Sequence, residues 1–114
     1  MSVPIQLKKL TANNVILNQL DFVDNSLIEE ISLKNSTINS DINFSNLPNL
    51  RKLDLTGCKI KSNITLANLG NLQTFIIEDA SFEGDFIIQD GVNINEFDFT
   101  ELSLNNISFS GSNL

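Results

Sequence analysis

The chain has 114 residues, and its 7 Lys or Arg against 14 Asp or Glu give a formal charge of −7. That balance excludes a basic protein that binds nucleic acid through its phosphates. His, Tyr and Trp are absent and Cys occurs once, which excludes imidazole catalysis, Cys/His zinc sites and an intrachain disulfide. The 17 asparagines favour tight turns over helices.

We expect neither a membrane span nor a secretion signal. No apolar run approaches the ~20 residues that a bilayer-spanning helix needs. Lys8 and Lys9 follow the first apolar residues instead of preceding an apolar stretch, unlike the order in a signal peptide. A cytoplasmic location is therefore expected, and a single thiol fits that compartment. The richness in Asn, Ile, Lys and Ser favours a bacterial source.

Pairs of apolar residues that flank one other residue recur along the chain with a period of 21 or 22. The first pair of each period begins at Leu10, Ile31, Leu53, Phe75 and Phe97. Further pairs follow every five or six residues, and in the period that starts at Leu53 they are Cys58/Ile60, Ile64/Leu66 and Leu69 with Leu72. Because side chains alternate along a strand, both members of a pair point to one side. Each pair therefore predicts a very short strand with two inward residues.

Short polar stretches between the pairs have the composition of corners. After the first pair of each period they read Asn13-Asn14, Lys34-Asn35, Thr56-Gly57, Glu78-Asp79 and Thr100-Glu101. In the period that starts at Phe75, the fourth inward pair is Gly91 with Ile94. Four strands and four corners close one coil of a square solenoid.

The predicted fold class is all-β: a right-handed quadrilateral parallel β-helix of about five coils, with 21–22 residues per coil. We predict one repeat domain over 1–114, with coils at about 5–30, 31–52, 53–74, 75–96 and 97–114. The coils should stack at about 4.8 Å around ladders of Leu, Ile and Phe. The right hand follows from the chirality of parallel-strand crossovers.

Two known families resemble parts of this repeat, and together the likeness covers about residues 5–114. Segments 99–104 (FTELSL) and 109–114 (FSGSNL) resemble pentapeptide-repeat proteins, whose coils are quadrilateral β-helices. Segment 47–60 (LPNLRKLDLTGCKI) is similar to a 22-residue leucine-rich repeat, with Cys58 where that family accepts Asn or Cys. The resemblance implies a β-solenoid between the two families that is leucine-rich-repeat-like in its middle.

We find no catalytic set in the sequence. Cys58 occupies an inward position alongside Ser36 and Ala80, and no His is available to activate it, so we interpret it as a small core residue. The Ser and Thr hydroxyls lack a base. Neither an ice-binding threonine ladder nor a glycine-rich calcium-binding repeat is present. We expect no enzymatic activity, no cofactor and no metal site.

Charge is distributed unevenly along the chain. All seven cations lie at or before Lys61, where six acids reduce the sum to +1, and from residue 62 onward there are eight acids and no cation. Since sequence order is axial order in a solenoid, this predicts a charge gradient. The expected acidic surface, which would bind a protein partner with a basic surface, consists of Asp54, Glu78, Asp79, Glu96, Asp98 and Glu101. The alternative is a solvated surface that only maintains solubility.

The ends of the array carry a second expectation. A solenoid terminus exposes strand edges and an apolar cross-section, and Pro4 would protect the first edge. The last coil provides the predicted oligomer interface: Leu102, Leu104, Ile107, Phe109 and Leu114. We expect either an end-to-end homodimer through this coil or a longer array. Charge opposes the two-fold contact, because it brings two acidic halves together.

These features predict a non-enzymatic repeat scaffold that mediates protein-protein interaction. One alternative is an acidic DNA mimic that inhibits a nucleic-acid enzyme, because some pentapeptide-repeat proteins resemble DNA and bind topoisomerases. The acids are sparse beside duplex phosphate density. Another alternative is a fragment of a bacterial surface leucine-rich-repeat adhesin, which would place the chain on the cell surface. None of these involves direct nucleic-acid binding.

Overall fold

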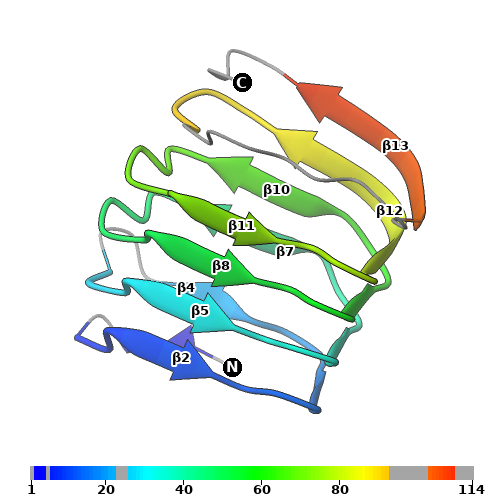
Figure 1. The fold of residues 1–114 in the computed structure, drawn as a ribbon, viewed down its shortest axis with the longest axis horizontal. Coiled ribbons are helices and arrows are strands. Elements are labelled where there is room, and N and C mark those ends of the chain that lie inside the picture. Colours follow the sequence, from blue (N-terminus) through cyan, green and yellow to red (C-terminus); the bar gives the residue numbers. More distant parts are fainter. Residues whose placement is uncertain (1, 5, 23–25, 93–102, 110–114) are drawn as a thin grey trace.

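The chain forms a stack of parallel β-strands, which the computed structural model describes for residues 2–4, 6–22, 26–92 and 103–109, the last segment for its backbone alone (Figure 1). The described residues contain strands and turns, and none belongs to a helix long and apolar enough to cross a membrane. The predicted all-β solenoid is confirmed, with about four turns in place of about five. Most of the predicted fifth coil, 97–114, falls outside the described residues.

One side of the solenoid is a four-stranded parallel sheet, called here the first sheet. Its strands, in order along the stack, are β2 (Lys9–Thr11), β5 (Glu30–Ser32), β8 (Lys52–Asp54) and β11 (Thr74–Ile76). Their central residues Leu10, Ile31, Leu53 and Phe75 are aligned as Cα partners. The register steps are therefore 21, 22 and 22, which confirms the predicted period over these coils.

A larger parallel sheet covers the second and third sides of each coil. The second side holds β3 (Ile16–Leu17), β6 (Thr37–Ile38) and β9 (Lys59–Ile60), and the third holds β7 (Ile42–Ser45) and β10 (Ile64–Ala67). Two long strands, β12 (Ser81–Ile88) and β13 (Ser103–Phe109), run along both sides. At the N-terminal end, β1 (Ser2–Val3) pairs with β4 (Asp21–Phe22).

The fourth side of the coil differs from the prediction. Its inward leucines are buried, but in the described coils this side consists of turns rather than strands. The N–H of Leu50 donates to the carbonyl of Leu47 at 3.2 Å, and Leu72 donates to Leu69 at the same distance. Two residues separate each pair, so a turn, and not strand alternation, brings both side chains inward. The coil therefore has three strand sides and one turn side.

Corner residues in the left-handed conformation form two ladders along the stack. The first contains Asn14, Asn35, Gly57 and Asp79, with φ between 56° and 68°. The second contains Asn46, Asn68 and Gly91, with φ between 52° and 80°. Gly, Asn and Asp tolerate this conformation better than other residues. The predicted corners of the first four coils are confirmed, and the ladders explain much of the asparagine content.

The second ladder also corrects one inward assignment. Gly91 takes the left-handed corner position and is exposed, so it is not the inward residue that was expected. Val92 takes that place instead, because it is fully buried and forms a β-bridge with Leu69. The local step from Leu69 is thus 23 residues instead of 22.

The interior is filled by side chains of successive coils. Inward residues of the middle coils, including Ile38, Ile60 and Ile64, have no exposed surface. The rings of Phe22 and Phe44 lie 5.5 Å apart, centroid to centroid, on neighbouring coils. The core is therefore a continuous column in which each coil covers the next.

β12 turns the corner between the second and third sides without ending, and this requires a glycine. The register of β12 against β13 shifts between Phe82 and Asp85. Gly84 lies at this bend, where an added Cβ would stand 2.5 Å from the carbonyl carbon and oxygen of Ser62. The two backbones therefore approach each other more closely than any side chain would allow.

Replacing Gly84 by Ala should lower the free energy of unfolding by about 1–3 kcal/mol, because the new methyl overlaps the Ser62 backbone. Gly70→Ala is the matched control, since a Cβ there meets nothing within 4 Å. That change should be neutral or stabilise by about 0.4–1 kcal/mol. Urea unfolding measures both variants, and equal losses at the two positions would contradict the close approach at Gly84.

Candidate functional site: the acidic belt

The structure places the expected acidic residues in different environments. Glu78 and Asp79 are exposed at the corner between β11 and β12, whereas Asp54 lies on β8 in the first sheet. Three of the expected residues lie outside the described part of the chain: Glu96, Asp98 and Glu101.

The expected oligomer interface also falls mostly outside what the structure describes. Leu102 and Leu114 are not among the described residues. The other three residues lie on β13, whose backbone register aligns Leu104 with Phe82, Ile107 with Phe86 and Phe109 with Ile88. This register matches the predicted inward row, while the interface itself stays a prediction.

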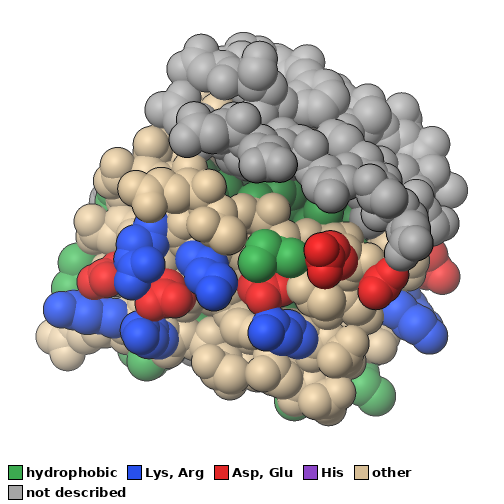
Figure 2. Space-filling view, in the orientation of Figure 1, with side chains coloured by type: hydrophobic (Ala, Val, Ile, Leu, Met, Phe, Trp, Pro, Cys, Tyr) green, Lys and Arg blue, Asp and Glu red, His purple; other side chains and the backbone are tan. Residues whose placement is uncertain are grey.

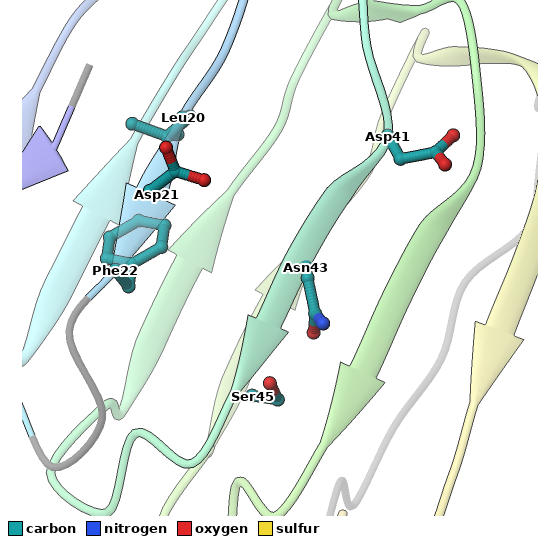
Figure 3. Close-up of a pocket in the computed structure, with 6 residues that line it drawn as sticks. All are labelled: Leu20, Asp21, Phe22, Asp41, Asn43 and Ser45. Carbon is teal, nitrogen blue, oxygen red and sulfur yellow. The ribbon is translucent and has the colours of Figure 1, made fainter.

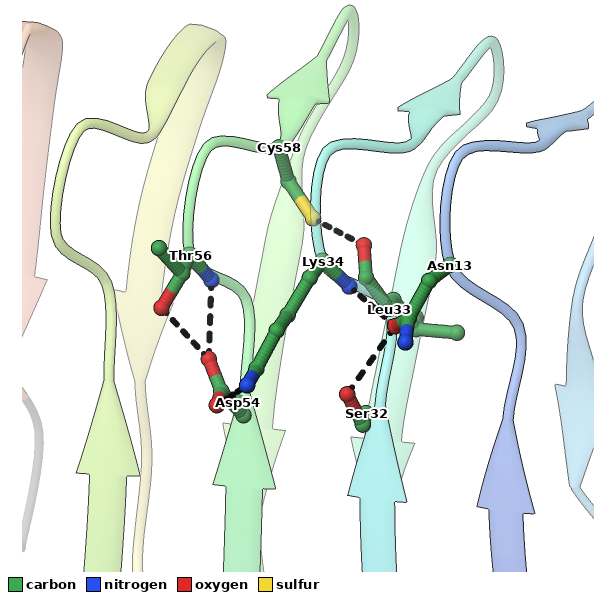
Figure 4. A network of polar contacts seen from close by, with 7 residues as sticks. All are labelled: Asn13, Ser32, Leu33, Lys34, Asp54, Thr56 and Cys58. Atoms are coloured by element: carbon green, nitrogen blue, oxygen red, sulfur yellow. Dashed lines mark hydrogen bonds and ion pairs between the residues drawn. The ribbon is translucent and has the colours of Figure 1, made fainter.

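Asp54 is a structural carboxylate and not an open docking group (Figure 4). Only 3% of the Asp54 surface is exposed. One carboxylate oxygen accepts hydrogen bonds from the backbone N–H of Thr56 at 3.0 Å and from its hydroxyl at 2.6 Å. The other lies 3.5 Å from the Lys34 ammonium. This placement corrects the expectation that Asp54 belongs to an exposed acidic surface.

Two more acids at the first sheet, Glu29 and Glu30, are also paired with cations. Glu30 lies 3.3 Å from the Lys9 ammonium and 2.9 Å from the Arg51 guanidinium, which in turn lies 3.9 Å from Glu29. Figure 2 shows Lys and Arg side chains interleaved with Asp and Glu side chains over the first sheet. The hydrogen bond from Lys9, followed by the charge of Arg51, lowers the pKa of Glu30. The acids at this sheet are thus paired with cations of the same molecule.

Acids beyond Asp54 form a different kind of surface. Four of the five exposed carboxylates on the described coil that begins at β11 lie at its corners, and we call them the acidic belt: Glu78, Asp79, Asp85 and Asp90. They lie at three successive corners, after β11, within the bend of β12 and after β12. In the described part of the chain none of the four has an ion-pair partner, and the sequence contains no cation after Lys61. The belt can therefore accept charge-assisted hydrogen bonds from Arg or Lys of another molecule.

The backbone that carries the belt is fixed by bonds between coils. The carbonyl of Glu78 accepts the N–H of Gly57 at 2.8 Å, and that of Asp90 accepts the N–H of Asn68 at 2.9 Å. The N–H of Asp85 donates to the side-chain oxygen of Asn63 at 2.8 Å. Each belt corner is thus held by the coil before it.

Asp41, Asn63 and Asp85 form a ladder that sequence reasoning missed. Asp41 accepts the N–H of Asn63 at 2.9 Å and also bonds the Ser62 hydroxyl, just as Asn63 accepts the N–H of Asp85. The Ser62 hydrogen bond is the main cause that lowers the pKa of Asp41. The sequence contains a signal for this ladder, because the three residues are spaced by 22, the same period as the coils.

Cys58 is fully buried, and Figure 4 shows its thiol pointing toward the carbonyl of Leu33. Its thiol donates to the carbonyl of Leu33 at 2.7 Å, and Ser36 on the preceding coil donates to the carbonyl of Ala12 at 2.8 Å in the same way. Burial raises the pKa of the Cys58 thiol, which disfavours the reactive thiolate. The side chain therefore has the environment of a core residue.

The described surface carries depressions of about 210, 350 and 390 Å³. Figure 3 shows one of about 210 Å³ between β4 and β7, lined by Leu20, Asp21, Phe22, Asp41, Asn43 and Ser45. Its two carboxylates are already engaged, because Asp21 accepts a hydrogen bond from Gln19 at 2.7 Å and Asp41 bonds Ser62. Within the described residues no three Asp, Glu, His or Cys side chains gather as metal ligands.

Comparison with known proteins gives no family for this chain. It matches no family model, no curated protein and no solved structure. The β-solenoid architecture therefore stands on the structure itself, and kinship with pentapeptide-repeat or leucine-rich-repeat proteins stays a prediction.

Removing the Asp54 carboxylate should be costly. Asp54→Ala leaves the N–H and hydroxyl of Thr56 and the ammonium of Lys34 without their acceptor, so the free energy of unfolding should fall by about 1–3 kcal/mol. Glu78→Ala removes an exposed acid and should change it by less than about 0.5 kcal/mol. Urea unfolding of the two variants checks this, and a loss at Glu78 as large as that at Asp54 would refute the assignment.

Acid should destabilise the fold through Glu30 and Asp41. Their pKa values lie below the ordinary 4.5 and 3.8, so the stability they add is fully present above those values. It is lost as the pH falls through the lowered pKa values of the folded state. As the pH falls through this acidic range, the free energy of unfolding of a Glu30→Gln, Asp41→Asn double variant should fall less steeply than that of the wild type. An equally steep fall in both proteins would contradict the lowered pKa values of Glu30 and Asp41.

Proposed function

We propose that this chain is a non-enzymatic scaffold that binds a protein with a basic surface through the acidic belt. One observation carries the proposal: the belt acids are exposed without a cation, whereas the acids of the first sheet are paired. Asp54 and Glu30 are neutralised by Lys34, Lys9 and Arg51. A partner that brings Arg or Lys to Glu78 would supply the charge that the chain itself lacks.

The rigidity of the coils supports this role. Belt carboxylates project from corners whose backbones are hydrogen-bonded to the preceding coil at Gly57, Asn63 and Asn68. A partner would therefore meet a surface that needs little backbone ordering on binding. Outward side chains also vary freely between coils, as Thr37, Lys59 and Ser81 do on one row, while the inward row stays apolar.

The absence of catalysis is part of the proposal. The buried Cys58 thiol and the depression between β4 and β7, whose two carboxylates are already engaged, support it. We further propose that the protein is cytoplasmic and bacterial. We also propose that it is related to pentapeptide-repeat and leucine-rich-repeat solenoids, and the 22-residue register and the left-handed corner ladders favour that relationship.

A DNA-mimic inhibitor is the second candidate, and the same unpaired belt acids favour it. Such a protein would compete with duplex DNA for a basic channel. A gyrase supercoiling assay at low ionic strength tests it directly. Inhibition that disappears as salt rises is expected of a mimic, and no inhibition at low salt would remove this candidate.

The leading proposal is tested by affinity capture with two charge-reversal variants. Glu78→Lys changes the belt, and Asp21→Lys makes the same change of charge on exposed β4 at the other end of the stack. Wild type and Asp21→Lys should retain one stoichiometric basic partner, and Glu78→Lys should lose most of it. Equal retention by both variants, or no stoichiometric partner together with turnover of a substrate, would overturn the proposal.

A further inference from the structure

The outer face of the first sheet carries a hollow of about 350 Å³, which we call the lysine hollow. Thr11 and Ser32 are Cα partners on β2 and β5, and their short side chains lie between longer ones. Lys9 and Lys52 line the hollow where their strands begin, and Lys34 lines it at the corner after β5. Three ammonium groups from three successive coils therefore surround two small polar side chains.

The two carboxylates that line the lysine hollow are already engaged. Glu30 lies 3.3 Å from the Lys9 ammonium and 2.9 Å from the Arg51 guanidinium. Asp54 lies 3.5 Å from the Lys34 ammonium and accepts two further hydrogen bonds. These cations reduce the repulsion that either carboxylate would exert on an incoming anion.

The lysines keep donors that no contact within the described coils uses. An ammonium has three N–H donors, and an ion pair occupies only part of them. Lys52 forms no ion pair with a described residue, although Glu30 is its Cα partner. Three lysines against two carboxylates give the lining a formal charge of +1, in a chain of −7.

Asn13 adds an oriented amide to the same hollow (Figure 4). Its Oδ1 accepts the backbone N–H of Lys34 and the hydroxyl of Ser32, both at 3.0 Å. A backbone N–H bonds the oxygen of an amide and not its nitrogen, so these contacts fix which end is which. The Nδ2 amino group donates to no described residue. The lysine hollow is therefore rich in unused donors, while its acceptors are engaged.

We propose that the lysine hollow binds a small anion that contains a phosphate group. The donors come from two sides, with Lys9 and Lys52 at the starts of the strands and Asn13 and Lys34 after their ends. Tetrahedral phosphate oxygens accept from several directions, and lysine binds phosphate as a point charge. The volume lies within the range of small-molecule sites, about 300–1,000 Å³. The site uses none of the four belt residues, so it is independent of the proposed protein partner.

Nuclear magnetic resonance of the full 15N-labelled chain tests this, with sodium phosphate titrated against sodium chloride at matched ionic strength and constant pH. The backbone amides of Thr11 and Lys34 and the side-chain amide of Asn13 should shift and saturate with phosphate alone. Lys52→Gln should weaken this binding several-fold. Lys59→Gln, the same change on exposed β9, should bind as wild type.

A second pair of variants tests the amide. Asn13→Asp keeps an oxygen for the Lys34 N–H and the Ser32 hydroxyl but replaces the free donor with negative charge, so saturable binding should be lost. Asn18→Asp is the matched control, because its side-chain oxygen also accepts a bond from the next coil, from Asn39 at 2.9 Å. It should bind phosphate as wild type does.

Glycerol phosphate and acetate complete the titrations. Tighter binding of glycerol phosphate than of inorganic phosphate identifies an organic phosphate as the ligand, and equal binding identifies the free ion. Shifts no larger than those with chloride would overturn the proposal. So would a stronger response to acetate, or equal binding by Lys52→Gln and Lys59→Gln. If Asn13→Asp fails to fold, the two lysine variants decide the outcome.

Discussion

Each inward side chain in the middle of this molecule is covered on both sides by the equivalent side chains of the neighbouring coils. Ile60, for example, lies between Ile38 and Phe82 in the strand register, and all three are at most 2% exposed. An apolar group in such a column gains from burial about 25 cal/mol per Å², and a polar one would lose its water without replacement. This constraint fixes the register of the coils, and the corners and surface follow from it.

The packing of equivalent side chains between coils requires tight backbone turns at the corners. Three strand sides and a turn must close in about 22 residues, so the chain turns from one side to the next within two or three residues at each corner. Left-handed Asn35 and Gly57 make this tight turn, and Gly84 lets β12 pass the corner beside Ser62. Side-chain oxygens of Asp41 and Asn63 then bond the next coil's backbone. The Asn63 bond holds the backbone of the belt residue Asp85, which links the interior register to the surface that the proposed partner would meet.

Periodic features of this fold were predictable from the sequence, and features of single coils were not. The spacing of Ile31, Leu53 and Phe75 predicts the register, because every coil repeats the same alternation.

The pair Leu47 and Leu50 has different spacing, and only the turn hydrogen bond between them shows that the fourth side is not a strand. Gly91 failed as an inward residue because the corner after Ile88 contains one more residue than the corner after its register partner, Leu66. Gly91 therefore takes the left-handed corner position, and Val92 comes inside. For the site, sequence order predicted a charge gradient, but pairing depends on distance, which is why Asp54 proved to be satisfied by Lys34 and Thr56.

The most direct measurement compares two neighbouring substitutions on β10. Ile64 is fully buried between Ile42 and Phe86, while Thr65 points outward and is partly exposed. Ile64→Asp should lower the free energy of unfolding by more than about 3 kcal/mol, because an unpaired carboxylate enters the apolar column. Thr65→Asp should change it by less than about 1 kcal/mol. Urea unfolding curves that show similar losses for both variants would contradict the inward register on which the whole stack depends.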